Sequence, residues 1–410
     1  MSVQPKNKRD SLLPAFNTMD SYYWWNYLCD NKMKKDWEIK KLGEIAKVSA
    51  GQSAPQDKSL FTNNGNPFIR AGNLEALVNG LNEQSLLKIE SNTAEKFKLK
   101  LFPKNSIIFA KSGMSASLNR VHVLKENCYV VSHLAVLEIK KDFPSFIKYH
   151  LMYNPPSKLI KDEGYPSISL YDIQNLEIPI PPLPVQEKIV AELDTLHRLK
   201  ELQEQQLTEL NNLAQSTFYD MFGDPIENEK GWEVKKFGNI FSLKSGVALS
   251  AKNIIDGEYP VYGGNGIVGY HNVFNTEGVN IIIGRVGALC GNVRLVSESI
   301  WLTDNAFKLN LVKENFDLIF LRNLLSIFDL RKFAREALQP VISNLTLKNI
   351  EVIIPPLSLQ TQFAERIEKI ESQKELIKQS IAQTQHLIDY TMDKYFGSIT
   401  FPVGKILFLF

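Results

Sequence analysis

The sequence predicts an α+β protein with an internal pseudo-twofold repeat. Two globular modules with twisted, mostly antiparallel sheets are separated by two long antiparallel helices that form a coiled-coil spacer. Three observations predict this fold class. Residues 173–223 align without a gap with residues 347–397, and 15 of the 51 positions are identical. Residues 37–51 align in the same way with residues 232–246, with seven matches in 15 positions. Each copy of the longer repeat contains at least 38 consecutive residues without proline or glycine, a length typical of a coiled-coil helix.

The repeats divide the chain into alternating globular and helical parts. In chain order, the expected parts are an N-terminal extension (1–33), a first module (34–183), a long helix (184–223), a second module (224–357), a second long helix (358–397) and a tail (398–410). The extension is rich in aromatic residues, and the tail ends in an apolar run. Because disordered arms contain few aromatic side chains, part of the extension is expected to pack on another surface.

The two modules are expected to consist of short strands broken by turns. Residues 129–139 and 279–296, for example, are rich in β-branched side chains and are interrupted or bounded by Gly, Asn and Ser, which is typical of strands. Between their repeated ends, the modules have little sequence in common. The repeated parts are therefore expected to form a scaffold, and the divergent parts to contact the target.

A short apolar run and a Pro-Pro pair precede each long helix. The run predicts a buried strand, and the prolines prevent its hydrogen bonding from continuing. Pro184 and Ser358 occupy aligned positions and suit a helix start, as a first-turn proline and an N-cap serine. Gly223 and Gly397 are matching helix ends.

Apolar residues recur at alternating steps of four and three along both helices, which predicts that each helix pairs with a partner. The expected seam residues are Ile189, Leu193, Leu196, Leu207 and Leu210 in the first helix, and Phe363, Ile367, Ile370, Ile377 and Ile381 in the second. The nearest partner is the other copy, because two unrelated core helices of an α/β domain would not explain their equal lengths. Lys200 and Lys374 also fall in the seam, where they could extend to solvent, fix the register or face another protein.

The composition is that of a soluble globular protein, with 44% hydrophobic and 22% charged residues and a net charge of +2. Residues 37–172 carry a net charge of +5 (18 Lys and Arg against 13 Asp and Glu), and residues 232–349 carry +3 (13 against 10). The modules therefore favour an anionic partner. Three widely separated cysteines argue against a disulfide framework or a zinc site and favour the cytoplasm. The sequence contains neither a cleavable signal peptide nor an apolar run of ~18 residues.

No complete catalytic motif is found in the sequence. Tyr153-Asn-Pro-Pro resembles the loop with which amino-methyltransferases hold a flipped base, but Ser157 follows where an aromatic side chain is needed. There is no Walker loop and no glycine-rich loop between a strand and a helix. The chain is therefore expected to recognise a target rather than to act as an enzyme. The alternatives are a methyltransferase or fused methyltransferase–nuclease fragment, and a coiled-coil assembly protein with no DNA role.

Polar and basic loop residues are the candidates for DNA contact, because Lys and Arg bind phosphates, while Arg and Asn also pair with base edges. In the first module they are Arg70, Asn73, Lys111, Ser112, Asn119 and Arg120, and in the second Asn265, Arg285, Asn292, Arg294, Asp304 and Asn305. No residue is expected to be catalytic or to bind a metal.

Three short motifs recur in both halves of the chain. They are the W-E-[IV]-K-K-x-G start of each module at Trp37 and Trp232, the I-P-P-L strand end before each long helix, and the F-G that closes the helix. Together with the twofold layout, these motifs resemble the specificity subunit of Type I restriction–modification enzymes. The match extends from Trp37 to Gly397, so the extension and the tail depart from the family pattern.

The resemblance implies that each module is a target recognition domain that reads one half of a split, asymmetric site in double-stranded DNA. It implies that the long helices fix the gap between the half-sites and dock two methylation subunits, which restriction subunits join. Methyl transfer from S-adenosylmethionine, and cleavage driven by ATP with Mg²⁺, would belong to those partners. This chain would then need no cofactor of its own.

Overall fold

The computed structural model describes residues 37–287, 289–312, 315–335 and 340–397. The expected N-terminal extension (1–33) and tail (398–410) lie outside these residues. The chain divides into two compact units. Of the described residues, 37–200 and 383–397 form unit one, and those between 201 and 382 form unit two. Each unit therefore contains one globular module and a segment of both long helices.

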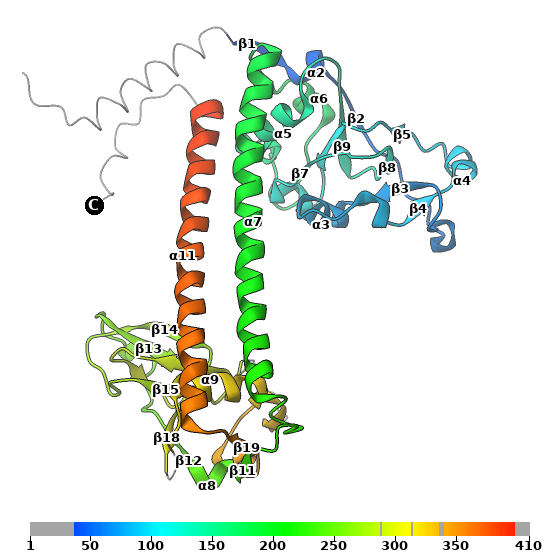
Figure 1. Cartoon of the computed structure of the whole chain (residues 1–410). Helices are drawn as coiled ribbons and strands as arrows, with labels where there is room; N and C mark the ends of the chain where they lie inside the picture. The colour runs from blue at the N-terminus through cyan, green and yellow to red at the C-terminus, as the bar shows by residue number, and fades with distance from the viewer. Residues whose placement is uncertain (1–36, 288, 313–314, 336–339, 398–410) are drawn as a thin grey trace, which may run out of the picture. The chain divides into compact units, whose positions relative to one another are not determined.

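The module of unit one contains three small sheets (Figure 1). The central sheet has the order β2-β9-β6-β7 and is antiparallel throughout. In the second sheet, ordered β4-β3-β8-β5, only β3 and β8 are parallel. The third is an antiparallel pair of β1 and β10. The strands are β1 Glu38–Lys41, β2 Ala46–Ala50, β3 Asn66–Ile69, β4 Lys88–Ile89, β5 Leu101–Phe102, β6 Ile107–Ala110, β7 Val121–Val123, β8 Cys128–Val130, β9 Leu134–Ile139 and β10 Glu177–Ile180. The helices are α2 Leu42–Ile45, α3 Leu74–Val78, α4 Ser91–Lys96, α5 Pro144–Tyr153 and α6 Leu170–Gln174.

The module of unit two repeats this framework. Its central sheet has the order β12-β18-β15-β16, a second sheet has the order β14-β13-β17, and β11 pairs with β19. The strands are β11 Glu233–Lys236, β12 Phe241–Ser245, β13 Tyr259–Gly263, β14 Gly266–His271, β15 Asn280–Gly284, β16 Val293–Val296, β17 Trp301–Leu302, β18 Ala306–Leu311 and β19 Glu351–Ile354. The helices are α8 Phe237–Ile240, α9 Leu318–Ile327 and α10 Asn344–Leu347.

The two central sheets have the same connectivity. Numbered along the chain, each has the order first, fourth, second, third, and in each module the first strand of the second sheet runs parallel to a later strand. The segments that lie between the repeated ends of the two modules have little sequence in common, yet the shared framework extends through the whole module. Strand pairing depends on backbone hydrogen bonds and on which face is apolar, so the topology persists without residue identity.

A glycine makes a close backbone approach at the same place in both modules. Gly51 directly follows β2, and Gly246 directly follows β12. A Cβ atom at these positions would lie 2.0 Å from the carbonyl oxygen of Val130 and 2.2 Å from that of Leu302, respectively. Only glycine fits without moving the neighbouring strand, which explains why both copies of the shorter repeat end in glycine.

The long helices are α7 Leu183–Phe222 and α11 Leu357–Phe396. Pro184 lies in the first turn, as expected, but the expectation that Ser358 is an N-cap is wrong, because α11 begins one residue earlier. The carbonyl of Pro356 accepts hydrogen bonds from the backbone N–H groups of Leu359 and Gln360 (2.9 and 3.2 Å). The backbone therefore starts this helix without a serine cap.

Within unit one, the first part of α7 runs antiparallel to the last part of α11 (Figure 1). The hydroxyl of Tyr395 donates to Glu192 Oε2 (2.7 Å), and Lys200 Nζ donates to Gln385 Oε1 (2.8 Å). From the first pair to the second, the residue number rises along α7 and falls along α11, so the two segments are antiparallel. Phe396 joins the core of the module, which shows that the helices and the module form one folded body.

Within unit two, the remaining segments of α7 and α11 are also antiparallel. Gln203 Nε2 donates to Ser380 Oγ (2.7 Å), and the rings of Phe218 and Phe363 pack edge to face with centroids 5.6 Å apart. The Phe320 ring of α9 stacks on Phe218 at 5.9 Å. Aromatic pairs at such distances contribute beyond the area they bury, so this cluster fixes both helices to the module.

The predicted seam residues face the core of their unit. Ile189, Leu193, Phe363, Ile367 and Ile370 are buried, while Leu196, Leu207, Leu210, Ile377 and Ile381 are half-buried. Of the two seam lysines, Lys200 bonds the opposite helix, and Lys374 pairs with Glu371 on its own helix (2.8 Å). The predicted α+β fold class, with two modules and two long helices, is thereby confirmed.

A buried glutamine occupies the same place in the first turn of both long helices. Gln186 and Gln360 are each 1% exposed. Gln186 accepts a hydrogen bond from the backbone N–H of Phe143 (3.0 Å) and donates to the carbonyl of the first proline of its Pro-Pro pair (2.9 Å). Gln360 accepts from the N–H of Asp317 (3.0 Å) and donates to the corresponding proline carbonyl (2.8 Å). Each amide thus joins the long helix to the start of a module helix.

Candidate nucleic-acid interface

The six candidate residues of the second module converge at the end of β15. The backbone N–H of Arg285 donates to the carbonyl of Asn305 (2.9 Å), and Arg285 Nη1 donates to the carbonyl of Asp304 (3.3 Å). The guanidinium carbon of Arg285 also lies 5.3 Å from the centroid of the Phe307 ring. These contacts join the loop after β15 to the turn before β18.

The other three candidates of this module join the same group of loops. Arg294 Nη2 donates to the backbone carbonyl of Asn265 (3.1 Å), in the hairpin between β13 and β14. The carbonyl of Asn292 accepts from the N–H of Gly284 (3.0 Å), the residue before Arg285. Asn265, Asn292 and Asn305 are exposed. The structure therefore brings the six residues together from three loops and from strand β16, which contains Arg294.

In the first module, the Arg120 side chain forms an ion pair with Glu75 (2.9 Å). This pair joins Arg120 to the segment that begins at Arg70, whose backbone N–H donates to Asn73 Oδ1 (2.8 Å). Asn119 is exposed and adopts a left-handed conformation with φ of 54°, which asparagine tolerates well. Four of the six candidates therefore lie on the two segments that this ion pair joins.

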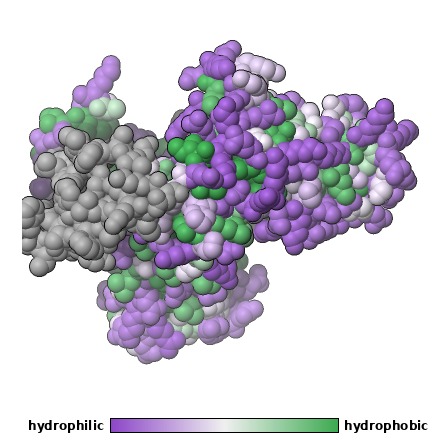
Figure 2. All heavy atoms as spheres, turned by 90° about the horizontal axis from the view of Figure 1, so that it is seen from above, coloured by the Kyte–Doolittle hydropathy of each residue, from purple (hydrophilic) through white to green (hydrophobic). Residues whose placement is uncertain are grey.

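The remaining two candidates, Lys111 and Ser112, follow directly after β6. The Ser112 hydroxyl is 3.0 Å from Nδ1 of His133. Asn119 and Arg120 border the same small hollow as Ala110, the last residue of β6. The two groups of candidates therefore lie on neighbouring loops. In the view of Figure 2 the surface of this module is mostly hydrophilic, with scattered apolar side chains.

Sequence reasoning missed Glu75 and His133. Glu75 partly neutralises Arg120, and no local pattern connects the two residues. His133 immediately precedes β9, and β9 pairs antiparallel with β6 so that Ala110 faces Leu134. An alignment of these two strands would have placed His133 opposite Lys111.

The Asn-Pro-Pro stretch after α5 is used for packing. Asn154 Nδ2 donates to the backbone carbonyl of Phe396 (3.4 Å), and the Tyr153 hydroxyl bonds Asp393. Burial, together with this carboxylate, raises the pKa of Tyr153 to about 12. The stretch therefore attaches the module to α11.

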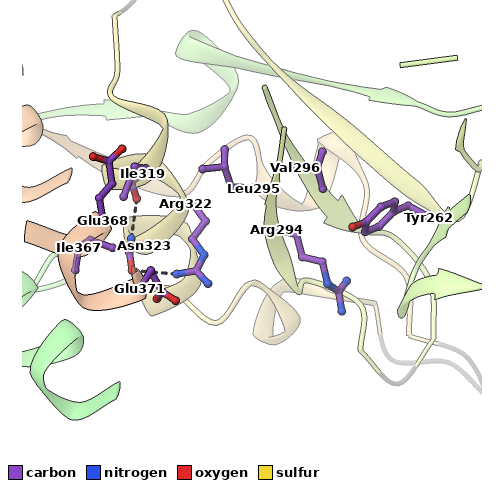
Figure 3. A pocket seen from close by; sticks show the side chains of 10 residues that line it. All are labelled: Tyr262, Arg294, Leu295, Val296, Ile319, Arg322, Asn323, Ile367, Glu368 and Glu371. Carbon is purple, nitrogen blue, oxygen red and sulfur yellow. Dashed lines mark hydrogen bonds between the residues drawn. The ribbon is translucent and has the colours of Figure 1, made fainter. Parts of the chain in front are cut away.

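Unit two also contains an open cleft of about 340 Å³ between β16, α9 and α11 (Figure 3). Its polar lining mixes Arg294 and Arg322 with Glu368 and Glu371. The Asn323 amide donates to a carbonyl in its own helix (2.7 Å) and its Oδ1 accepts from Arg322 (3.3 Å). Cations and carboxylates alternate here, so the cleft lacks the single-sign field that would favour a phosphate. In the part of the chain that the structure describes, no three His, Cys, Asp or Glu side chains form a candidate metal site.

Comparison with known proteins identifies the two repeats. A model of the family described as "Type I restriction modification DNA specificity domain" matches residues 34–212 and 229–386. The Type I restriction enzyme EcoprrI specificity subunit of Escherichia coli is 27% identical over 357 residues, which cover 81% of this chain and 86% of that subunit. The MjaIX specificity subunit of Methanocaldococcus jannaschii is 33% identical over 168 residues, but this match spans only 38% of that subunit and 40% of this chain.

A solved structure shares the fold. The crystal structure of a Type I restriction–modification S subunit from M. genitalium matches with a TM-score of 0.59 at 17% identity, over 89% of this chain and 97% of that one. Among the described helices, none has the length and apolarity needed to cross a bilayer.

Proposed function

This chain belongs to the family of Type I restriction–modification specificity subunits and carries two target recognition domains, and on this premise we propose that each domain reads one half of a bipartite, asymmetric DNA site. The observation that supports the proposal is the repeated framework with different loops. The central sheets share one strand order, while the charged and amide side chains after their strands differ. Loops on a rigid scaffold are where recognition residues usually lie.

The two modules offer different side chains for base reading. The first presents Asn119 and Arg120, and the second presents Asn265, Asn292 and Asn305. Asparagine pairs well with adenine and arginine with guanine in the major groove. Because the two modules present different side chains, they are expected to read different half-sites, which fits an asymmetric DNA site better than a palindromic one.

We also propose that the long helices set the gap between the half-sites. In both units their paired segments are held by the module core and by polar bonds across the seam, such as that between Gln203 and Ser380. A polar pair in a coiled-coil seam specifies register. A fixed register makes helix length the quantity that determines the permitted gap.

The test removes one heptad from each helix in register. Deleting residues 201–207 and residues 377–383 together removes about 10 Å of each helix and leaves the seam pattern continuous. Methylome sequencing of a host with the altered gene should show a changed gap between unchanged half-sites. Deleting only one of the two segments is the control, because it disrupts the register and should abolish modification. Altered half-sites with an unchanged gap would contradict the proposal.

The chain is proposed to act with methylation and restriction subunits, two methylation subunits being expected. Large apolar side chains exposed on the long helices suit a protein partner: they include Leu199 and Leu387 in unit one, and Leu202, Leu213 and Leu376 in unit two. S-adenosylmethionine, ATP and Mg²⁺ would be bound by those subunits, and this chain would itself be non-catalytic. Calorimetry with the purified chain should detect no binding of S-adenosylmethionine, whereas binding at micromolar concentration would favour the methyltransferase alternative.

A further inference from the structure

A basic residue occupies the same backbone position in both modules. Lys111 follows β6 and Arg285 follows β15, and the two strands are equivalent in their sheets. The residue numbers differ by 174, the offset of the long repeat. The backbone N–H of Lys111 donates to the carbonyl of His133, and that of Arg285 to the carbonyl of Asn305, both at 2.9 Å.

The backbone carbonyl of each basic residue is bonded in the same way. The carbonyl of Lys111 accepts from the N–H of Ile168 (2.8 Å), and the carbonyl of Arg285 accepts from the N–H of Ile342 (2.9 Å). Ile168 and Ile342 are again 174 positions apart. Each basic residue is thus held by hydrogen bonds on both sides, and its Cα has little freedom to move.

The glycine two residues later completes the frame. Gly113 donates its N–H to the carbonyl of Pro166 (2.9 Å), and Gly287 to that of Pro340 (3.2 Å). Both glycines have positive φ, 77° and 96°, a conformation that glycine adopts without strain. The chain therefore turns in the same direction after each basic residue, although the side chains beyond the turn differ.

The charges of Lys111 and Arg285 are less compensated than that of Arg120. Arg120 is paired with Glu75. Arg285 contacts a backbone carbonyl and an aromatic ring, and within the described residues neither Lys111 nor Arg285 forms an ion pair with a carboxylate. Both are half-buried, so a positive charge lies near the end of the central sheet in each module.

We propose that Lys111 and Arg285 are equivalent positioning residues that each bind a DNA phosphate and do not read a base. This inference rests on the proposed function. The two side chains share a charge but not a geometry, since arginine presents a planar fork and lysine a point charge. A phosphate accepts either side chain and is present in every half-site, so it explains why one backbone position stays basic in two modules that read different bases. Arg285 is therefore assigned to the backbone rather than to a base edge.

The experiment measures binding of the full-length chain, assembled with its methylation subunits, to two DNA duplexes. One contains the recognition site found by methylome sequencing, and the other has both half-sites scrambled. The variants are Lys111→Gln, Arg285→Gln and the double substitution. Lys47→Gln and Lys236→Gln are controls, because these lysines are exposed on β2 and β11, and Lys47 lies at the opposite end of the sheet from Lys111.

Each test substitution should weaken binding to both duplexes by the same factor. The slope of log K against log salt should become less negative by about 0.9 per substitution. The ratio of wild-type to variant affinity should then fall about 3.5-fold between 50 and 200 mM salt, and the effects should add in the double variant. The charge-preserving substitutions Lys111→Arg and Arg285→Lys should bind both duplexes as the wild type does, and the control substitutions should leave binding unchanged.

A loss confined to the specific duplex, or failure of Arg285→Lys to restore binding, would overturn the assignment, because either result indicates base reading. Binding that is unchanged in both variants would also overturn it. A wild-type complex that bound both duplexes equally would instead refute the proposed function, and the inference with it. Matching thermal melts for all variants would exclude unfolding as the cause of a loss.

Discussion

Replacement of the buried glutamines tests how the modules are attached to the long helices. The change is Gln360→Leu, which keeps an apolar volume but removes one acceptor and one donor. It leaves the N–H of Asp317 and a proline carbonyl without their partners, and these were bonded at 3.0 and 2.8 Å. An unpaired buried polar group costs about 1–3 kcal/mol. We expect a loss of about 2–4 kcal/mol for the pair, since part is recovered when water enters.

The assay is native-state hydrogen exchange at the Asp317 amide, because this amide loses its acceptor. A loss of about 2–4 kcal/mol corresponds to exchange that is roughly thirty- to several-hundred-fold faster. Gln186→Leu should have the equivalent effect at the Phe143 amide in unit one. Gln373→Leu, exposed on the same helix as Gln360, is the control. Unchanged exchange at Asp317 in Gln360→Leu would refute the reasoning.

Two further predictions concern stability. Burial, with a smaller effect of nearby Lys158, lowers the pKa of His150 to about 4. The unfolded chain takes up a proton at this histidine near pH 6.5, and the folded chain does not. The free energy of unfolding of unit one should therefore fall by about 3 kcal/mol as the pH falls from 6.5 to 4. Urea denaturation across this range should show that His150→Leu flattens the dependence, and parallel curves would contradict it. Gly246→Ala should destabilise unit two by about 1–3 kcal/mol in the same assay, since the added Cβ meets the Leu302 carbonyl oxygen at 2.2 Å. Gly72→Ala, where a Cβ meets nothing within 4 Å, should have little effect, and equal losses at both sites would contradict the packing argument.

The long helices were predictable because their signal is local and repeated. The absence of proline and glycine, the heptad of apolar residues and the duplicated ends all belong to short stretches of sequence. Gly51 and Gly246 could likewise be recognised as paired positions. Their reason, a neighbouring strand carbonyl about 2 Å from the missing Cβ, became evident only from the fold.

The equivalence of Lys111 and Arg285 was not evident from the sequence. At the offset of 174, the shared residues are two isoleucines of the preceding strand, the glycine two residues later, and the proline, isoleucine and following serine of the facing loop. The remaining likeness consists of backbone hydrogen bonds, which almost any residue can make. A search for matches at the offset of 174 across the whole module would have shown these shared positions.

The side-chain partners of the candidate residues could not be predicted either. Arg120 meets Glu75, which is 45 positions away in the sequence, and Arg294 meets the carbonyl of Asn265. Such pairs depend on how several loops converge, and neither hydrophobic periodicity nor turn residues encode that convergence. Whether each candidate contacts a base stays a prediction.

Unit one is built from two segments that are far apart in the chain, and this affects its biosynthesis. Tyr395 and Phe396 belong to its core together with residues of the first module, and the hydroxyl of Tyr395 is bonded to Glu192, 203 positions earlier. The domain that leaves the ribosome first is therefore completed last, after all of unit two has been translated. A premature stop codon in the second half of the gene would leave the first domain with an exposed apolar face. The truncated chain would then be a substrate for chaperones and proteases.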